Sequence, residues 1–306
     1  MLRRALLWAS RNEVLARRLP RLGFVQRATR RFLPGEELGD ALAEAHRMAE
    51  QGMPTTLTRL GENVDTPAQA DAVLDHYREA MATAQEAGLD TELSVKLTHL
   101  GLDQDLDGTA NRVHALLEVM PGNQLLWLDM EDSSYTDRTM ALTRDVGGDG
   151  GRLGICLQAY LRRTEGDVAA LEGTRTPVRL VKGAYRESSS VALVEPQAVD
   201  RAFAVLTRRL LEARAEERLG RIVVATHDTA LLDEAARIAG ELELPSDTWE
   251  YAMLYGIRPD EQQRLADAGH RVRVLIAYGS EWFPWYMRRL AERPANLVFV
   301  ARQLLG

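Results

Sequence analysis

Short apolar runs alternate with longer stretches of helical periodicity from residue 51 onward, and this alternation constrains the fold more than any other feature of the chain. It is typical of βα units wound around a parallel sheet. The predicted strands are residues 54–58, 92–97, 125–130, 154–159, 178–181, 222–226, 249–253 and 271–276. The clearest predicted helices are residues 66–86, 198–218, 229–240 and 259–268. The first helix has a hydroxyl N-cap in Thr66, a proline at the first helical position in Pro67 and a capping-box amide in Gln69.

Eight strands, each followed by a crossover, favour a closed (βα)8 barrel, and 306 residues leave room for extra helices. We expect an α/β fold in which residues 51–306 form one barrel domain with the functional site, preceded by an N-terminal helical arm over residues 1–50. An open, doubly wound sheet is the alternative, because periodicity alone does not show that a sheet closes. The glycine-rich loop at residues 147–151 is no dinucleotide-binding turn, because it precedes its strand instead of following one and opening a helix.

The charge balance and the cysteine count indicate which classes of partner and which cellular compartment to expect. Against 45 Asp and Glu there are 38 Lys and Arg, so the net charge is −7. This acidic balance argues against nucleic-acid binding, which needs a basic face. One cysteine, Cys156, allows no internal disulfide, so a reducing cytoplasm is the expected location. No apolar stretch approaches the ~18 residues that span a bilayer, so no integral membrane segment is predicted.

Residues 1–31 form a basic amphipathic segment. They carry nine arginines and only one acid, Glu13, with leucines between them. Such a segment could contact an anionic surface such as the inner membrane, or serve as an arginine-rich transit peptide. The third interpretation is that these are ordinary helices of the fold whose charges lie in solvent.

Polar side chains stand at the carboxyl ends of consecutive predicted strands, where barrels of this type carry their catalytic groups. These residues are Lys96, Asp129, Glu131, Asp132, Gln158, Arg179, Lys182, Thr226, His227 and Asp228. A solvated rim would explain any one of them, but their joint occurrence on otherwise apolar strands predicts a functional site.

Lysine usage strengthens this prediction. The chain contains only two lysines, Lys96 and Lys182, and both lie at predicted strand ends. Lysine is a compact point charge whose pKa moves on burial, whereas arginine is a planar fork that stays charged. We therefore expect these two positions to need a property that arginine lacks.

A pair of arginines, Arg288 and Arg289, follows the last predicted strand. Adjacent arginines also occur at Arg3-Arg4 and elsewhere, so the dipeptide alone says little. This pair, however, follows an aromatic run that includes Trp282 and Trp285. Two guanidinium groups beside an aromatic wall suit an anionic, partly apolar ligand whose carboxylate is bound bidentately.

Together these segments resemble the proline dehydrogenase family, FAD-containing enzymes with a distorted (βα)8 barrel. The matching segments, in chain order, are residues 93–98, 128–133, 154–158, 179–185, 225–228, 253–257 and 287–294. The resemblance implies a noncovalently bound FAD and hydride transfer from L-proline to flavin N5, giving Δ1-pyrroline-5-carboxylate. It also implies a membrane quinone as electron acceptor, which would require peripheral contact with the membrane.

The resemblance also implies roles for individual residues. Lys96, Arg288 and Arg289 would hold the substrate carboxylate, Asp129 would orient these cations, and Leu254 would pack on the substrate ring. Residues expected to hold the FAD, with Arg179 near the flavin ring, are Gln158, Arg179, Lys182, Gly183, Ala184, Thr226, His227 and Glu292.

Two positions depart from the family pattern. Leu275 and Trp285 stand where the family carries tyrosines at the ring end of the substrate. A pocket changed there would suit a substituted proline, such as 4-hydroxyproline, or another cyclic amino acid.

Other enzyme classes and a non-catalytic role stay open on the sequence. A strand-end Lys96 or Lys182 could form a Schiff base, as in an aldolase. Asp129, Glu131 and Asp132 could bind a divalent metal in a lyase. A flavin-binding sensor barrel without catalysis is the third alternative, because both family tyrosines are lost.

Overall fold

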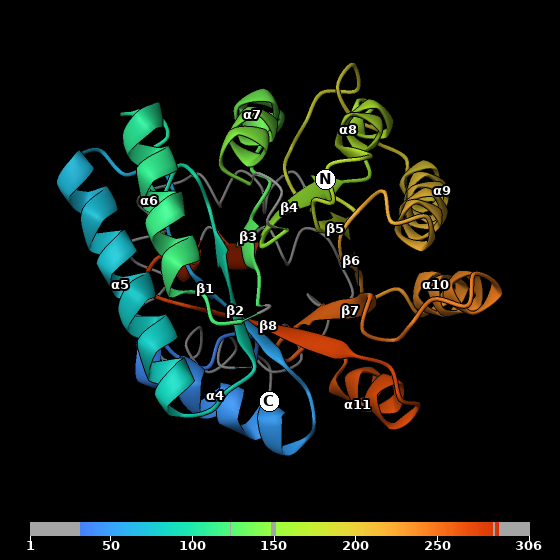
Figure 1. The fold of residues 1–306 in the computed structure, drawn as a ribbon, viewed down its shortest axis with the longest axis horizontal. Coiled ribbons are helices and arrows are strands. Elements are labelled where there is room, and N and C mark those ends of the chain that lie inside the picture. Colours follow the sequence, from blue (N-terminus) through green and yellow to red (C-terminus); the bar gives the residue numbers. More distant parts are fainter. Residues whose placement is uncertain (1–30, 123, 148–150, 284, 288–306) are drawn as a thin grey trace, which may run out of the picture.

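The computed structural model describes residues 31–122, 124–147, 151–283 and 285–287. Eight parallel strands close into a barrel in chain order, with helices around the outside (Figure 1). Pairing of the last strand with the first completes the barrel, from Thr55↔Val274 to Arg59↔Tyr278. The predicted closed barrel is therefore confirmed, and the open-sheet alternative is wrong.

Strands and helices lie where the sequence pattern placed them. The strands are β1 (Thr55–Arg59), β2 (Thr91–Val95), β3 (Leu126–Leu128), β4 (Leu153–Gln158), β5 (Val178–Val181), β6 (Ile222–Ala225), β7 (Trp249–Leu254) and β8 (Val272–Tyr278). The helices are α4 (Leu38–Glu50), α5 (Pro67–Glu86), α6 (Leu106–Val119), α7 (Thr136–Gly147), α8 (Thr164–Leu171), α9 (Pro196–Ala215), α10 (Thr229–Glu241) and α11 (Pro259–Asp267), with a short 3₁₀ helix η2 (Ser133–Tyr135) before α7. Each predicted strand end lies within two residues of the observed one.

The start of α5 confirms the predicted cap. Thr66 Oγ1 accepts a hydrogen bond from Gln69 N at 3.3 Å, and Gln69 Oε1 accepts one from Thr66 N at 3.0 Å. The reciprocal pair satisfies backbone N–H groups that the first helical turn leaves free. Within the described ranges no helix is long and apolar enough to cross a membrane.

The main hydrophobic core lies between the barrel and its helices. Strand residues that face outward, such as Leu93, Ile155 and Val224, are fully buried against helix residues such as Leu116 and Leu210. Helix α4 packs across β1 and β8, where it closes the ring of helices (Figure 1). Burial of this much apolar surface is the main stabilising term for such a fold.

Buried charged side chains fill the amino-terminal end of the barrel. Arg273 Nε donates to Glu250 Oε1 at 2.8 Å and lies 3.4 Å from Glu92 Oε2, and all three residues are at most 2% exposed. Arg221 pairs with Glu92, and Arg271 Nε donates to Glu250 Oε2 at 2.8 Å. We call Glu92, Glu250, Arg273, Arg221 and Arg271 the floor network. It fills the amino-terminal end of the barrel in the described part of the chain.

Trp127 lies above the floor network, inside the barrel. Its Nε1 donates to Glu92 Oε2 at 2.7 Å. A Cβ on Gly154 would lie 2.5 Å from the indole ring, so only glycine leaves room for the tryptophan. Trp127 packs with Leu125 and Val223 in a small interior cluster. This layer separates the floor network from the mouth.

Candidate active site

A cavity of about 590 Å³ opens at the carboxyl ends of the strands. Thirteen of the residues predicted for the site line it: Lys96, Asp129, Gln158, Arg179, Lys182, Gly183, Ala184, Thr226, His227, Asp228, Leu254, Leu275 and Trp285. They come from the seven strands β2 to β8 or the loops after them, and from the segment after β8. The predicted Arg288, Arg289 and Glu292 lie outside the described residues.

Three charged residues form one wall of this cavity. Arg179 Nη2 lies 2.5 Å from Asp129 Oδ1, and Lys96 Nζ lies 3.7 Å from Asp129 Oδ2. Ser94 Oγ donates to the same Oδ1 at 2.8 Å and accepts from Arg179 Nη2 at 2.7 Å. One carboxylate thus faces two cations, so the wall carries a net positive charge that suits an anionic ligand.

Arg179 is held rigidly in this wall. Its guanidinium lies 5.0 Å above the Trp127 ring, a cation–π contact that supports it from below. Burial opposes its charged form, but Asp129, Cys156 and Glu92 together outweigh burial and hold the pKa of Arg179 above its ordinary value. The neighbouring Cys156 thiol has a raised pKa because it is buried, so it stays protonated.

Gln158 reaches the cavity from the end of β4. Its Nε2 donates to the carbonyl oxygens of Met130 and Glu131 at 3.1 and 3.2 Å. Its Oε1 is buried and has no hydrogen-bond partner in the described part of the chain. Two fixed donor bonds therefore leave an acceptor available to a ligand that brings an N–H group.

Lys182 follows β5 and is held by two acids. Its Nζ lies 2.5 Å from Asp200 Oδ1 and 3.0 Å from Asp228 Oδ2. Burial of Asp228 opposes its charge, but the hydrogen bond and the charge of Lys182, together with the backbone N–H groups of Ala230 and Leu231, outweigh burial and lower the pKa of Asp228. The next residue, Gly183, has φ +115°, and a Cβ there would lie 2.2 Å from the Tyr160 ring. Glycine therefore lets the loop after β5 pass along the cavity.

The opposite side of the cavity is apolar. Leu254, Leu275 and Trp285 line it and pack in one cluster at the mouth. His227 Nε2 accepts a hydrogen bond from Leu254 N at 2.9 Å, which fixes the backbone that carries Leu254. The Thr226 hydroxyl accepts from Asp228 N at 3.3 Å, which shapes the neighbouring loop. A ligand here would meet cations on one side and an apolar surface on the other.

Sequence reasoning missed several residues of the cavity. Thr58, on β1, lines it with a buried hydroxyl that forms no hydrogen bond of good geometry among the described residues. Tyr185 and Asp200 also line it. The alternation of polar and apolar residues along β1 could have indicated Thr58, since Thr58 shares the inward side with Thr56. Asp200 lies on α9, and no strand-end signal marks it.

The structure does not favour the metal alternative. Asp129 binds Arg179 and Ser94, Glu131 binds Thr98, and Asp132 Oδ1 accepts from Ser134 N at 3.0 Å. The three carboxylates therefore do not converge. Over the described ranges no group of three or more metal-binding side chains is present.

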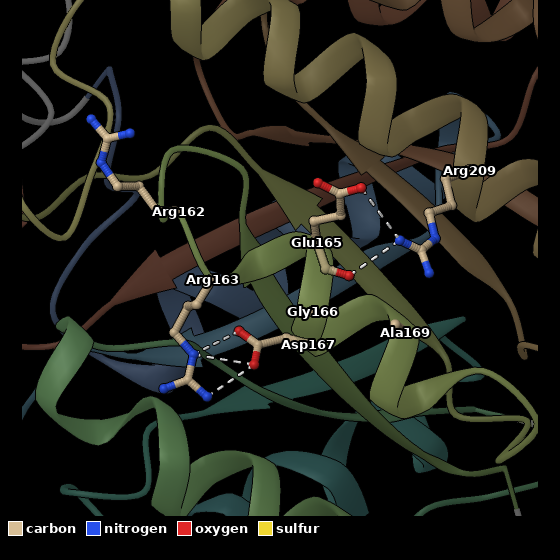
Figure 2. Close-up of a pocket in the computed structure, with 7 residues that line it drawn as sticks. All are labelled: Arg162, Arg163, Glu165, Gly166, Asp167, Ala169 and Arg209. Atoms are coloured by element: carbon tan, nitrogen blue, oxygen red, sulfur yellow. Dashed lines mark hydrogen bonds and ion pairs between the residues drawn. The ribbon is translucent and has the colours of Figure 1, made fainter.

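A second hollow, of about 640 Å³, lies on the outer surface at α8 and α9 (Figure 2). Arg163 Nε donates to Asp167 Oδ2 at 2.9 Å, and Arg209 Nη1 donates to the Glu165 carbonyl at 3.2 Å. Arg162 points away from these residues in Figure 2. The charges that face this open hollow are already paired, so it is not the candidate site.

Comparisons with known proteins agree on one family. A family model described as "Proline dehydrogenase" matches residues 41–302. Proline dehydrogenase 1 of Bacillus subtilis (strain 168) is 34% identical over 307 aligned positions, covering 100% of this chain and 99% of that protein. Proline dehydrogenase of Deinococcus radiodurans is 35% identical over 283 positions, covering 90% of this chain and 89% of that protein.

A solved structure supports the fold. The crystal structure of proline utilization A from Bdellovibrio bacteriovorus, inactivated by N-propargylglycine, has a TM-score of 0.78 to this chain. The two are 24% identical, and the match covers 87% of this chain and 32% of that protein. At this identity the likeness concerns the barrel fold alone.

Proposed function

The chain belongs to the proline dehydrogenase family, whose members are oxidoreductases that act on proline, and on this premise we propose that it oxidises L-proline to Δ1-pyrroline-5-carboxylate with a noncovalently bound FAD. The observation that carries the proposal is the wall formed by Lys96, Asp129 and Arg179. It places fixed cations at the end of the barrel opposite the floor network. One cavity can thus hold an amino-acid anion and a redox cofactor together.

The chain's own residues bind and orient the substrate. Lys96 binds the substrate carboxylate, together with Arg288 and Arg289. Asp129 does not bind the substrate but holds Lys96 and Arg179 in position through its two ion pairs. The apolar cluster at the mouth, with Leu254 and Trp285, packs on the substrate ring and excludes water. Holding substrate and acceptor in register is the main requirement, because hydride transfer needs no protein nucleophile.

The residues around the cavity fit an FAD. The unpartnered Gln158 Oε1 matches the ring N–H of an isoalloxazine, and small side chains such as Ala225 and Ala252 leave room for a flat ring. An FAD bound by these residues would supply the acceptor for a hydride from the proline carbon next to the ring nitrogen. The residues proposed to hold it are Gln158, Arg179, Lys182, Gly183, Ala184, Thr226, His227 and Glu292. The charge of Arg179 stabilises the negative charge that develops on the ring.

A membrane quinone is the proposed electron acceptor. The physical support is the basic segment 1–31, whose nine arginines would be attracted to anionic lipid. Peripheral contact at the inner membrane from the cytoplasmic side would bring the protein to the quinone pool.

A hydroxylated proline is the second candidate substrate. The observation in its favour is the Thr58 hydroxyl, which is 3% exposed and lines the cavity together with Leu275. This hydroxyl interacts with Tyr77 but forms no hydrogen bond of good geometry in the described part of the chain. Thr58 pairs in register with Ala277, two residues after Leu275 on β8. A buried polar group without a well-formed hydrogen bond favours a ligand that supplies one.

We expect Thr58→Val to lower kcat/KM for 4-hydroxyproline by about 5- to 10-fold, the equivalent of one neutral hydrogen bond. Turnover of L-proline should change less than about twofold, because its ring offers no hydroxyl to Thr58. Steady-state kinetics with a dye acceptor measure both. Thr207→Val is the matched control, since Thr207 is also buried without a well-formed hydrogen bond within the described ranges but lies on α9, away from the cavity. Equal losses of kcat/KM for both substrates would show that Thr58 does not hydrogen-bond to a ring hydroxyl.

The proposed function is tested by anaerobic titration of the purified protein with L-proline and with 4-hydroxyproline, following the flavin spectrum. We expect a yellow protein that bleaches on addition of L-proline. A colourless protein would support the Schiff-base or metal lyase, and a yellow protein that neither substrate bleaches would support the sensor. Preferential bleaching by 4-hydroxyproline would favour the second substrate.

A further inference from the structure

Glu131 is a buried carboxylate at the mouth of the barrel that does not line the cavity. It follows β3 by three residues and is 4% exposed. Its two carboxylate oxygens accept hydrogen bonds from one residue, Thr98: Oε1 from the backbone N–H at 3.0 Å and Oε2 from the hydroxyl at 2.5 Å. The side chain therefore binds the loop after β2 through two hydrogen bonds to one residue.

That loop carries the cation at the centre of the site. Thr98 is two residues after Lys96, and Leu100 N donates back to the Lys96 carbonyl at 3.2 Å, so the segment is a tight turn. Thr98 Oγ1 also accepts from Asn63 N at 3.2 Å. Hydrogen bonds through Glu131 and Thr98 thus connect the end of β3 to the loop after β2 and to the loop after β1.

The backbone of Glu131 holds a second site residue. Its carbonyl oxygen accepts from Gln158 Nε2 at 3.2 Å, beside the bond from the same nitrogen to the Met130 carbonyl. These bonds orient Gln158 so that its unpartnered Oε1 remains available to a ligand. One residue therefore contacts both the loop that carries Lys96 and the side chain of Gln158.

Burying this carboxylate is unfavourable, which makes a purely structural role a poor explanation. Burial raises the pKa of Glu131 to about 7, although the two bonds from Thr98 and the charge of Lys96 lower it. Glu62 is the other charged group that acts on it, and it raises the pKa. A neutral side chain would fill the same space at a smaller desolvation penalty.

We propose that Glu131 is a positioning residue that fixes Lys96 relative to Gln158, and so holds the substrate carboxylate in register with the flavin. The proposal rests on the proposed function, because Lys96 and Gln158 are its substrate and flavin ligands. Glu131 acts through these two residues and touches neither ligand itself.

The test compares Glu131→Ala with Glu131→Gln in the flavin-loaded protein. Alanine removes both acceptors, and we expect kcat/KM for L-proline to fall about 100-fold, as a misplacement of about 1 Å can produce. Glutamine keeps an acceptor for Thr98 N and can donate to the Thr98 hydroxyl, so it should restore activity to within about fivefold of the native protein. The flavin absorption maximum should shift in the alanine variant and return in the glutamine variant, because Gln158 contacts the flavin.

Thr98→Val provides a second, milder test. It removes the hydroxyl bonds to Glu131 and from Asn63 N but keeps the backbone bond to Glu131, and we expect about a 10-fold loss of kcat/KM. Combined with Glu131→Ala the two losses should be clearly less than additive, because both changes break the contact between Glu131 and Thr98. This variant keeps the proposal testable if Glu131→Ala does not fold.

Asp167→Ala is the matched control for loss of a buried carboxylate. Asp167 is 6% exposed and binds Arg163 on the outer surface (Figure 2). It should lower the melting temperature without changing kcat/KM by more than about twofold. The proposal would be overturned if Glu131→Ala lowered kcat/KM no more than Asp167→Ala does. It would also be overturned if the losses of kcat/KM were additive in the double variant of Glu131→Ala and Thr98→Val. Failure of the native protein to bleach with L-proline would instead overturn the proposed function.

Discussion

Replacing Arg273 by methionine is expected to lower the free energy of unfolding by about 3–5 kcal/mol, because it leaves buried carboxylates without their central cation. Arg273 is 2% exposed and lies between Glu250 and Glu92. Burial opposes ionisation of Glu250, but Arg273 and Arg221 outweigh it and hold its pKa below the ordinary value. This stabilisation is therefore present at neutral pH and is lost as acid protonates the carboxyl. Urea denaturation at pH 7 measures the loss.

Two further variants show whether the loss of stability in Arg273→Met comes from an uncompensated buried charge or from lost packing. Arg271 also binds Glu250 but its side chain is 35% exposed, so Arg271→Met should lower the free energy of unfolding by only about 1 kcal/mol. Adding Glu250→Gln to Arg273→Met should restore part of the stability, because it removes the unpaired charge. Equal losses in the two arginine variants would contradict a charge-dependent floor network.

Replacing Asp129 by asparagine is expected to lower kcat/KM for L-proline by about 100-fold. Asp129 is the shared partner of Lys96 and Arg179, and without its charge the two ion pairs that orient these cations are lost. The loss should fall on kcat and not on KM, because Asp129 competes with the substrate carboxylate for Lys96 and its removal does not weaken that bond. Steady-state kinetics at equal flavin loading separate the two parameters.

Ser94→Ala is the companion to this variant. Ser94 bonds both Asp129 and Arg179 but carries no charge, so its loss should lower kcat/KM about 10-fold. If Asp129→Asn instead raised KM and left kcat unchanged, Asp129 would bind the substrate directly and our assignment of its role would be wrong.

The fold was predictable because its signal is local. Each strand is a short apolar run, each helix has its own period, and the Thr66 cap is contained within four residues. Right-handed parallel crossovers then leave few arrangements for eight such units. Convergence of Lys96, Asp129, Gln158 and Arg179 followed from the same logic, because the carboxyl ends of parallel barrel strands meet at one rim.

What the sequence did not reveal depends on contacts between distant residues. Glu92 and Glu250 look like interruptions of apolar strands, and only the closed barrel shows that Arg273 neutralises both. Glu131 and Asp132 were equivalent rim acids in the sequence, yet one is buried against Thr98 and the other caps η2. Thr58 was missed because the lack of a well-formed hydrogen bond to a hydroxyl is a property of its surroundings.

The proposed function requires one cavity to hold both the flavin and the substrate carboxylate, with Lys96 bound to the carboxylate. The most direct measurement is titration of the flavin spectrum with tetrahydro-2-furoate, which keeps the ring and carboxylate of proline but has oxygen in place of the amine. We expect a saturable spectral change without bleaching in the native protein. In Lys96→Met the same change should need at least about 10-fold more ligand, because a charge-assisted bond is lost. An unchanged titration in Lys96→Met, or no spectral change in the flavin-loaded native protein, would show that Lys96 does not bind the substrate carboxylate beside the flavin.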